Sequence, residues 1–292
     1  MKDLLDIDDL DRAEIEELYE LTDRLKADPD AFGDSLTNES LVMLFAKPST
    51  RTRISFEAGM TELGGHAIHF SKAHSQISRG ESLTDTATVL SRYAGGIMAR
   101  LFDHQTLLAL ADGAEVPVIN GLTDKLHPCQ ALADGYTLRE RGLVDGPLAY
   151  VGDGNNVAHS LMQLCATLDI PCRIATPPGY EPDETIQKRV ADADVLITND
   201  PVEAVRGARA VYTDVFVSMG DDEAKRSDFE GYQVTPELMA QSDDAAFMHC
   251  LPAHRGEEVS AAVMDGENSI VYDQAENRKH VQKAILHRVY GI

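Results

Sequence analysis

The chain has 292 residues, of which 43% are apolar, so it is long enough for two ordinary domains and an extensively disordered chain is excluded. Against 26 basic residues stand 49 acidic ones, a formal net charge of −23. This charge argues against a nucleic acid or an anionic membrane surface as partner. The acidic residues are spread along the chain rather than gathered in one tail, a pattern that would suit a salt-rich cytoplasm where screening relieves their repulsion.

No apolar run approaches the roughly 20 residues that span a bilayer, and the N-terminus MKDLLDIDDL has no signal-peptide core. We therefore expect a soluble cytoplasmic protein. The cysteines form no C-x-x-C pair and are not spaced as in a disulfide framework, so reduced thiols are expected. They are Cys129, Cys165, Cys172 and Cys250.

Strand-like and helical patterns alternate along the chain and are joined by short turns, which predicts α/β architecture. In the first half we expect strands at 41–46, 67–70, 96–101 and 116–119, and helices at 82–93 and 130–141. After a turn around Gly146 the pattern restarts. There we expect strands at 148–151, 172–175, 195–198, 210–213 and 246–249, and a helix at 157–168. The fold class predicted is α/β, with two doubly wound parallel-sheet domains and an interdomain cleft.

The stretch KPSTRTRISF, residues 47–56, follows the first strand and places basic residues at a helix start. Ser49 or Thr50 is the predicted cap, which puts Arg51 and Arg53 in the first turn. The free amides and the dipole favour negative charge there, by roughly 0.3–1 kcal/mol per group. An anion with several oxygens, such as a phosphate, would remove the conflict. The alternative is two solvated arginines paired with acidic neighbours.

The stretch 152–156, GDGNN, resembles the start of a dinucleotide fingerprint, but Val157 stands where the third glycine belongs. The next strand also ends without the acidic residue that would hold a ribose, so nicotinamide binding is not expected. The two asparagines suit hydrogen bonding of a small polar ligand at the carboxyl end of a strand. Simple asparagine turn chemistry is the alternative.

Two proline-containing stretches carry histidine and cysteine, HPCQ at 127–130 and HCLPAHRG at 249–256. A zinc site at His249, Cys250 and His254 has no second ligand pair of familiar spacing. A cysteine–histidine nucleophile is a further alternative, although a buried cysteine or a core histidine is commoner than either. Asp214 and Ser218 follow a strand and could contact a ligand amine, but taken alone their segment is only a loop.

Taken together and in this order, these segments resemble the ornithine carbamoyltransferases over nearly the whole chain. The motifs are FAKPSTRTR at 45–53, SQ at 75–76, ESLTDTA at 81–87, HPCQ at 127–130, GDGNN at 152–156, TDVFVSMG at 213–220, HCLP at 249–252 and ENR at 276–278. The STRTR element is shared with aspartate carbamoyltransferases and indicates only carbamoyl phosphate. The SMG and HCLP elements are specific to the ornithine branch.

The resemblance implies a carbamoyl-phosphate domain at 1–142, an ornithine domain at 146–274 and a C-terminal helix at 275–292 that packs back on the first domain. It implies no cofactor and no metal. It also implies a homotrimer or a multiple of trimers, in which Gln76 reaches a neighbour's active site. The chain departs from most relatives in being shorter around 180–195 and in having Phe216 where many have tryptophan.

The resemblance also assigns site residues. The carbamoyl-phosphate positions are Ser49, Thr50, Arg51, Thr52, Gln76, Arg100, His127, Gln130, Cys250, Leu251 and Arg278. The ornithine positions are Asn156, Asp214, Ser218 and Met219. The catalytic positions are Arg51, Arg100, His127 and Cys250. The reaction implied is transfer of the carbamoyl group to the δ-amine of ornithine, giving citrulline and phosphate. The alternatives are transfer to a related amine such as putrescine, and a non-catalytic phosphate or amino-acid sensor.

Overall fold

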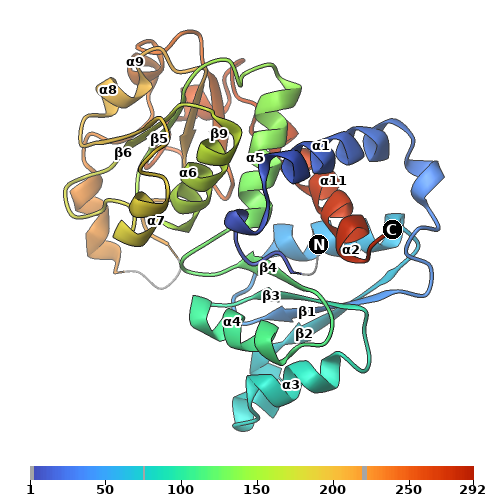
Figure 1. Ribbon diagram of the computed structural model, residues 1–292. Coiled ribbons are helices and arrows are strands. Elements are labelled where there is room, and N and C mark those ends of the chain that lie inside the picture. The colour runs from blue at the N-terminus through green and yellow to red at the C-terminus, as the bar shows by residue number, and fades with distance from the viewer. Residues whose placement is uncertain (1–2, 75, 219–221) are drawn as a thin grey trace. The chain divides into compact units, whose positions relative to one another are not determined.

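The computed structural model describes residues 3–74, 76–218 and 222–292, without the side chain of His74. The chain forms two compact units (Figure 1). The first comprises Met1–Ala133 and Arg278–Ile292, and the second comprises Asp134–Asn277. The division falls inside one helix, α5 (Pro128–Glu140), and inside another, α11 (Val271–Val289).

The first unit is built on a four-stranded parallel sheet in the order β2-β1-β3-β4. Its strands are β1 (Ser40–Phe45), β2 (His66–Ser71), β3 (Gly96–Arg100) and β4 (Val118–Leu122). All four were predicted, but β4 begins two residues later than the predicted 116–119. The reason is Pro117, which has no N–H to give to a sheet ladder; its carbonyl accepts from Ile97 just before the strand starts.

Helices cover both faces of this sheet. They are α1 (Arg12–Ala27), α2 (Thr50–Glu62), α3 (Leu83–Leu90), α4 (His104–Gly113), the start of α5 and the end of α11, with short 3-10 helices at η1 (Ile7–Asp9), η2 (Pro29–Phe32), η3 (Lys72–His74) and η4 (Gln76–Arg79). In Figure 1, α3 and α4 lie on one face, and the apolar side chains of α4, such as Leu107 and Leu110, share a cluster with Ile97 of β3. On the other face α2 packs on α11, where Gly59 faces Lys283.

The second unit has a five-stranded parallel sheet in the order β7-β6-β5-β8-β9. Its strands are β5 (Leu148–Val151), β6 (Cys172–Ala175), β7 (Val195–Thr198), β8 (Ala210–Thr213) and β9 (Ala246–His249), each with the predicted bounds. Its further helices are α6 (Asn156–Leu168), α7 (Glu184–Arg189), α8 (Pro201–Val205), α9 (Pro236–Met239), α10 (Ala261–Met264) and the 3-10 helix η5 (Glu223–Phe229). The prediction of two doubly wound parallel sheets is thus confirmed.

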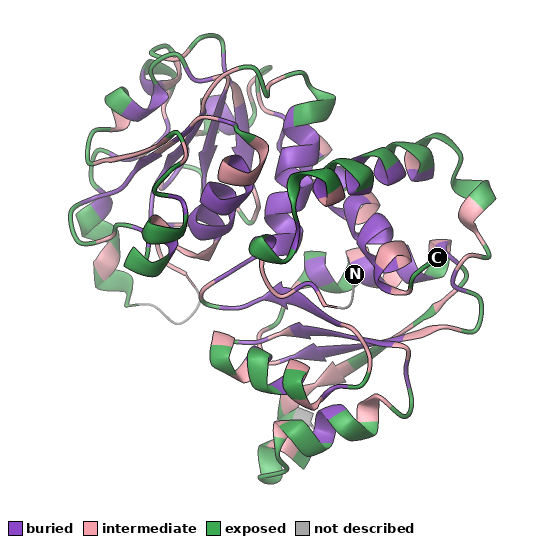
Figure 2. Cartoon of the chain, in the orientation of Figure 1, coloured by how far each residue is buried: buried purple, intermediate pink, exposed green. Residues whose placement is uncertain are grey.

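The cores lie along the strands, which are mostly buried except for the edge strands β2 and β7, while the outer faces of the helices are exposed (Figure 2). In the second unit Phe216, expected to stand where many proteins of the resembled family have tryptophan, is buried and stacks on Phe229 with ring centroids 4.6 Å apart. None of the helices in the described part of the chain is long and apolar enough to cross a membrane.

Each sheet has one point where the strand order reverses. In the first unit this point lies between β1 and β3, and in the second between β5 and β8. Open α/β sheets bind ligands at the carboxyl ends of the strands beside such a point, because the connections leave in opposite directions and open a crevice. The residues that follow β1, β3, β5 and β8 are therefore the first place to look for a site.

Candidate functional site

In the first unit, the segment after β1 forms the helix start that the sequence predicts. Ser49 is the N-cap of α2, and its hydroxyl accepts from the backbone N–H of Thr52 at 3.2 Å. The first turn of α2 contains no acidic residue. The free backbone amides at the start of α2 are thus not paired with a carboxylate from the same turn. This leaves them available to an anion.

Two arginines from distant segments meet at the hydroxyl of Thr52. Arg100, the last residue of β3, donates to Thr52 Oγ1 at 3.3 Å, and Arg278 of α11 donates to the same oxygen at 3.2 Å. Ser49 Oγ lies 3.1 Å from that oxygen as well. The buried hydroxyl therefore lies at the centre of a cluster of donors that spans the point where the strand order reverses.

The loop before α5 adds an imidazole and an amide to this cluster. The Arg278 guanidinium donates to Gln130 Oε1 and lies 3.4 Å from His127 Nε2. All three side chains are buried. The loop is shaped by Thr123, whose hydroxyl accepts from the N–H of Leu126 at 3.2 Å. The structure thus brings together Ser49, Thr52, Arg100, His127, Gln130 and Arg278, which are six of the positions predicted for carbamoyl phosphate.

His127 is a neutral imidazole at ordinary pH. Burial lowers its pKa well below 6.5, and the positive charges of Arg278 and Arg100 lower it further. A guanidinium can only donate, so Nε2 is the acceptor toward Arg278 and the ring proton lies on Nδ1. His127 can therefore polarise a bound oxygen as a hydrogen-bond donor but not as a cation.

The two arginines of the STRTR stretch have different roles. Arg53 forms an ion pair with Glu57 one turn along α2, at 2.8 Å. For this residue the alternative of a solvated arginine paired with an acidic neighbour therefore holds. Arg51 is exposed, and no carboxylate of the described chain forms an ion pair with it. Of these two arginines, Arg51 is the one that is available for a ligand at the helix start.

Other predicted donor-site positions lie at the edge of this cluster or outside it. Thr50 is the exposed first residue of α2, and Gln76 is exposed in η4. Within the described residues, Gln76 makes no hydrogen bond to the cluster. Cys129, which follows His127 in the HPCQ stretch, is buried, and burial raises the pKa of its thiol to about 12. It donates to the carbonyl of Asn120 at 3.4 Å, which marks it as a packing residue.

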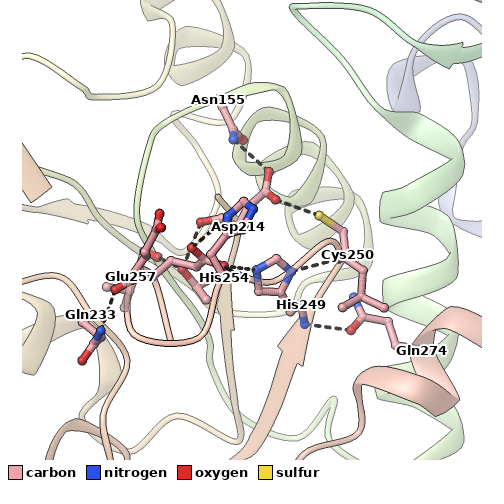
Figure 3. Close-up of polar contacts among 12 residues, drawn as sticks. Asn155, Asp214, Gln233, His249, Cys250, His254, Glu257 and Gln274 are labelled. Atoms are coloured by element: carbon pink, nitrogen blue, oxygen red, sulfur yellow. Dashed lines mark hydrogen bonds and ion pairs between the residues drawn. The ribbon is translucent and has the colours of Figure 1, made fainter. Parts of the chain in front are cut away.

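The second unit has its polar cluster at the carboxyl ends of three neighbouring strands. Asn155 follows β5, Asp214 directly follows β8 and Cys250 directly follows β9. Asn155 Nδ2 donates to Asp214 Oδ2 at 3.0 Å, and Cys250 Sγ donates to Asp214 Oδ1 at 3.0 Å (Figure 3). The carboxylate therefore joins the two sides of the point where the strand order reverses.

Asp214 is a buried carboxylate with neutral neighbours. It is only 7% exposed, and its partners are an amide and a thiol. No lysine, arginine or histidine among the described residues forms an ion pair with it. Burying a carboxylate without a cation is costly, and a ligand ammonium at this place would remove that cost. The cluster is thus suited to bind an amine.

Cys250 is a neutral thiol in this setting. Burial raises its pKa well above 9.0, and the negative charge of Asp214 raises it further. Neither ring nitrogen of His249 faces the sulfur, because one contacts Glu258 at 3.2 Å and the other accepts from the N–H of Leu251 at 2.9 Å. The alternative of a cysteine–histidine nucleophile is therefore not supported, since only a thiolate attacks.

The same contacts argue against a metal at this segment. Asp214, His249 and Cys250 lie close enough together to share an ion, but both nitrogens of His249 are already engaged. His254 lies with Glu257 and Glu258 in a second such group. There the carboxylate of Glu257 forms an ion pair with Arg226 at 2.7 Å. The zinc hypothesis for His249, Cys250 and His254 thus fails on geometry, because the two histidines turn toward Glu258.

The structure places the four predicted ornithine positions differently. Asp214 lies in the cluster, and Ser218 is half-buried five residues after β8. Met219 lies outside the described residues. Asn156 is the first residue of α6, whereas its neighbour Asn155 contacts Asp214. The resemblance assigned only Asn156 to ornithine, although the sequence pattern indicated both asparagines as hydrogen-bonding residues for a small polar ligand.

Sequence reasoning did not predict an ion pair that lies beside the cluster. Lys225 of η5 binds Asp153 at 2.7 Å, and both side chains are mostly buried. The ammonium also lies over the ring of Tyr180, 5.2 Å from its centroid. Asp153 belongs to the GDGNN turn and Lys225 follows the SMG segment, so this pair ties together the chain on either side of the site.

Comparison with known proteins agrees with this geometry. Residues 2–140 match the family description "Aspartate/ornithine carbamoyltransferase, carbamoyl-P binding domain", and residues 145–289 match "Aspartate/ornithine carbamoyltransferase, Asp/Orn binding domain". These two matches cover almost the whole chain. The chain belongs to the aspartate/ornithine carbamoyltransferase family.

Several similar relatives within that family are named ornithine carbamoyltransferase. It is 60% identical over 291 residues to "Ornithine carbamoyltransferase, catabolic" of Halobacterium salinarum, covering 98% of each chain. It is 50% identical to the ornithine carbamoyltransferase of Methanothermobacter thermautotrophicus, covering 100% of this chain and 99% of that one. The solved ornithine carbamoyltransferase of Pyrococcus furiosus is 46% identical with a TM-score of 0.92, covering 98% of this chain and 96% of the other.

Proposed function

We propose that this protein transfers the carbamoyl group of carbamoyl phosphate to the δ-amine of L-ornithine, giving L-citrulline and phosphate. The single observation that carries the proposal is Asp214, a buried carboxylate without a cationic partner in the described chain, placed 3.0 Å from the thiol of Cys250. Family membership supplies the reaction type, and Asp214 supports an amino acid with a free ammonium as the acceptor.

The first unit binds the donor in this proposal. The start of α2, with Ser49, Thr50 and Thr52, holds the phosphate through backbone amides and hydroxyls, and Arg51 adds charge from outside. Arg100 and Arg278 complete the charge compensation around the phosphate and the carbamoyl group. The convergence of both guanidinium groups on Thr52 supports these roles.

The carbamoyl group itself is oriented by the HPCQ loop. Neutral His127 and charged Arg100 donate to its oxygen, where negative charge develops during attack. Gln130 holds its NH2 group through the side-chain oxygen. Cys250 and Leu251, which the resemblance also assigns to carbamoyl phosphate, belong to the second unit. Fixed donors of this kind reduce the reaction barrier because they need no reorganisation when the charge appears.

The second unit binds ornithine. Asp214 and Ser218 bind its α-ammonium, Asn156 binds its carboxylate, and Met219 completes the site. Cys250, a neutral thiol beside Asp214, lies near the reacting amine and favours its uncharged form, because an uncharged group in this place does not stabilise an ammonium.

The chemical step needs no protein nucleophile. The uncharged δ-amine attacks the carbamoyl carbon and forms a C–N bond, and a tetrahedral intermediate results. Its collapse breaks the C–O bond to phosphate, which leaves with the electron pair and accepts the amine proton. The same contacts serve both directions, so they agree equally with the relatives named catabolic and anabolic.

We further propose that the protein works as a homotrimer or a multiple of trimers in a salt-rich cytoplasm. Gln76 then reaches a neighbour's donor site, which would account for its exposure away from its own. Large exposed apolar side chains in the first unit, such as Ile54 and Tyr93, support an association surface there. The net charge of −23 supports the high-salt setting.

An acceptor panel tests the proposal against its rivals. The protein is supplied with carbamoyl phosphate and one of ornithine, putrescine or aspartate in concentrated KCl, and the carbamoylated product is measured. We expect citrulline and little product from putrescine, which has a second ammonium for Asp214 but no carboxylate for Asn156. Carbamoylputrescine as the main product would support the related-amine alternative, and phosphate binding without any transfer would support the sensor.

A further inference from the structure

The turn that carries Cys250 and Leu251 has an unfavourable backbone conformation. Leu251 has φ +60°, in the left-handed region that a branched side chain seldom adopts. Such a conformation persists only where the surroundings hold it. The contacts that hold this residue are therefore part of how the site is built.

The first of these contacts comes from the ring of His249. The N–H of Leu251 donates to His249 Nδ1 at 2.9 Å. Because Nδ1 accepts, the ring proton is on Nε2, and this N–H points at Glu258 Oε1, 3.2 Å away. The orientation and tautomer of His249 thus depend on Glu258.

Glu258 is placed to hold that ring in one orientation. The side chains of His249 and Glu258 are both fully buried. Burial alone would raise the pKa of this carboxyl, but hydrogen bonds from His249 and from the backbone N–H of His254 outweigh it, so the pKa lies below its usual value. Glu258 is therefore an ionised acceptor at neutral pH.

The residue before Cys250 is held from the opposite side. The backbone N–H of His249 donates to Gln274 Oε1 at 2.9 Å, and Gln274 Nε2 donates to the buried Asp134 at 2.7 Å (Figure 3 shows the first of these bonds). Tyr212 also donates to Asp134, at 3.1 Å. The backbone on both sides of Cys250 is thus tied to buried carboxylates.

We propose that Glu258 is a positioning residue, which acts through His249 to hold Cys250 and Leu251 in place against the acceptor bound at Asp214. Packing alone does not explain a buried carboxylate here, because apolar residues of similar volume usually stabilise a core as well or better. What Glu258 adds is a directional acceptor that apolar packing cannot supply. This inference rests on the proposed function for its kinetic readout.

The test compares Glu258→Ala and Glu258→Gln with Glu257→Gln, a matched change at the neighbouring residue, whose carboxylate pairs with Arg226 at 2.7 Å. In Glu258→Ala we expect kcat/KM for ornithine to fall about 10- to 100-fold, because small misplacements of reacting groups cause losses of this size. Glu258→Gln should recover part of this loss, because its amide oxygen can still accept from His249. Inorganic phosphate binding, measured by calorimetry, should stay within about twofold because the predicted phosphate residues lie in the other unit.

A second readout does not depend on turnover. Nitrogen-15 spectra of the histidines should show His249 as the Nε2–H tautomer in the wild-type protein, and Glu258→Gln should shift that signal while Glu257→Gln leaves it. Wild-type kcat/KM in folded Glu258→Ala, an equal loss of phosphate binding, a Glu258→Gln protein no better than Glu258→Ala, or the Nδ1–H tautomer would each overturn the proposal. Absence of citrulline from the wild-type protein would instead refute the proposed function, and the spectra would still decide the role of Glu258.

Discussion

Two side chains of opposite charge, Arg51 and Asp214, differ from the charged residues around them. Arg53 pairs with Glu57 and Lys225 pairs with Asp153, each within 3 Å. Neither Arg51 nor Asp214 has an ion-pair partner among the described residues. A charge without an ion-pair partner at the carboxyl end of a strand is suited to a ligand of the opposite sign, which in the proposed function is a phosphate for Arg51 and an ammonium for Asp214.

Replacing Arg51 tests the donor half of the site. We expect Arg51→Gly to reduce kcat/KM by a hundredfold or more, since loss of one donor to a developing charge costs about 3 kcal/mol. Arg53→Gly is the matched control, because it makes the same helix-weakening change two residues further along α2. Steady-state rates with both substrates varied give the comparison. Equal losses of kcat/KM in the two variants would show that Arg51 contributes only to the stability of α2 and not to binding of the donor.

The thiol of Cys250 offers a test by pH. Its pKa is raised, so the reactive thiolate forms only well above pH 9.0, and alkylation by iodoacetamide should be slower at pH 8 than for a free cysteine. Asp214→Asn removes the negative charge next to the thiol, which lowers the pKa and should speed the reaction. Mass spectrometry locates the label, and Cys250 is the one cysteine that is not fully buried. Rapid alkylation of the wild-type protein at pH 7 would contradict the assignment of a neutral thiol.

At the scale of elements, the strands of the second unit could be predicted from sequence because short apolar runs are bounded by clear turn residues, such as Pro147 before β5 and Gly152 after it. Helix α1 was not predicted, although Asp11 and Glu14 form a capping box that the sequence displays. The site residues at strand ends could be predicted because their loops carry unusual polar stretches. Glu258 and Gln274 could not, since a single acid or amide on an ordinary segment gives no sign of being buried.

One carboxylate of α2 pairs with two lysines of α11. Glu62 accepts from Lys279 at 2.7 Å and from Lys283 at 2.9 Å, and Lys283 is only 1% exposed. In Glu62→Gln the buried ammonium loses its counter-charge, and we expect the free energy of unfolding to fall by about 3 kcal/mol. Adding Lys283→Met should restore most of it. Urea denaturation of both variants measures this, and a double variant no more stable than Glu62→Gln would show that the loss has another cause.

At the scale of the whole molecule, the net charge of −23 predicts that the stability of the protein depends on salt. Acidic side chains repel one another at low ionic strength, and the Debye length falls from about 10 Å at 0.1 M salt to about 3 Å at 1 M. We expect the midpoint of thermal unfolding to rise as KCl increases from 0.1 M to above 1 M. A midpoint that falls steadily over this range would refute the high-salt setting.

The most direct test of the central claim follows phosphate and citrulline together during one reaction. If the amine attacks carbamoyl phosphate directly, each phosphate released is matched by one citrulline, and carbamoyl phosphate with the protein alone gives no rapid phase of phosphate release. Rapid quench with carbamoyl phosphate labelled in the carbamoyl carbon measures both products. A burst of phosphate equal to the protein concentration before ornithine is added would reveal a carbamoylated side chain and contradict direct transfer.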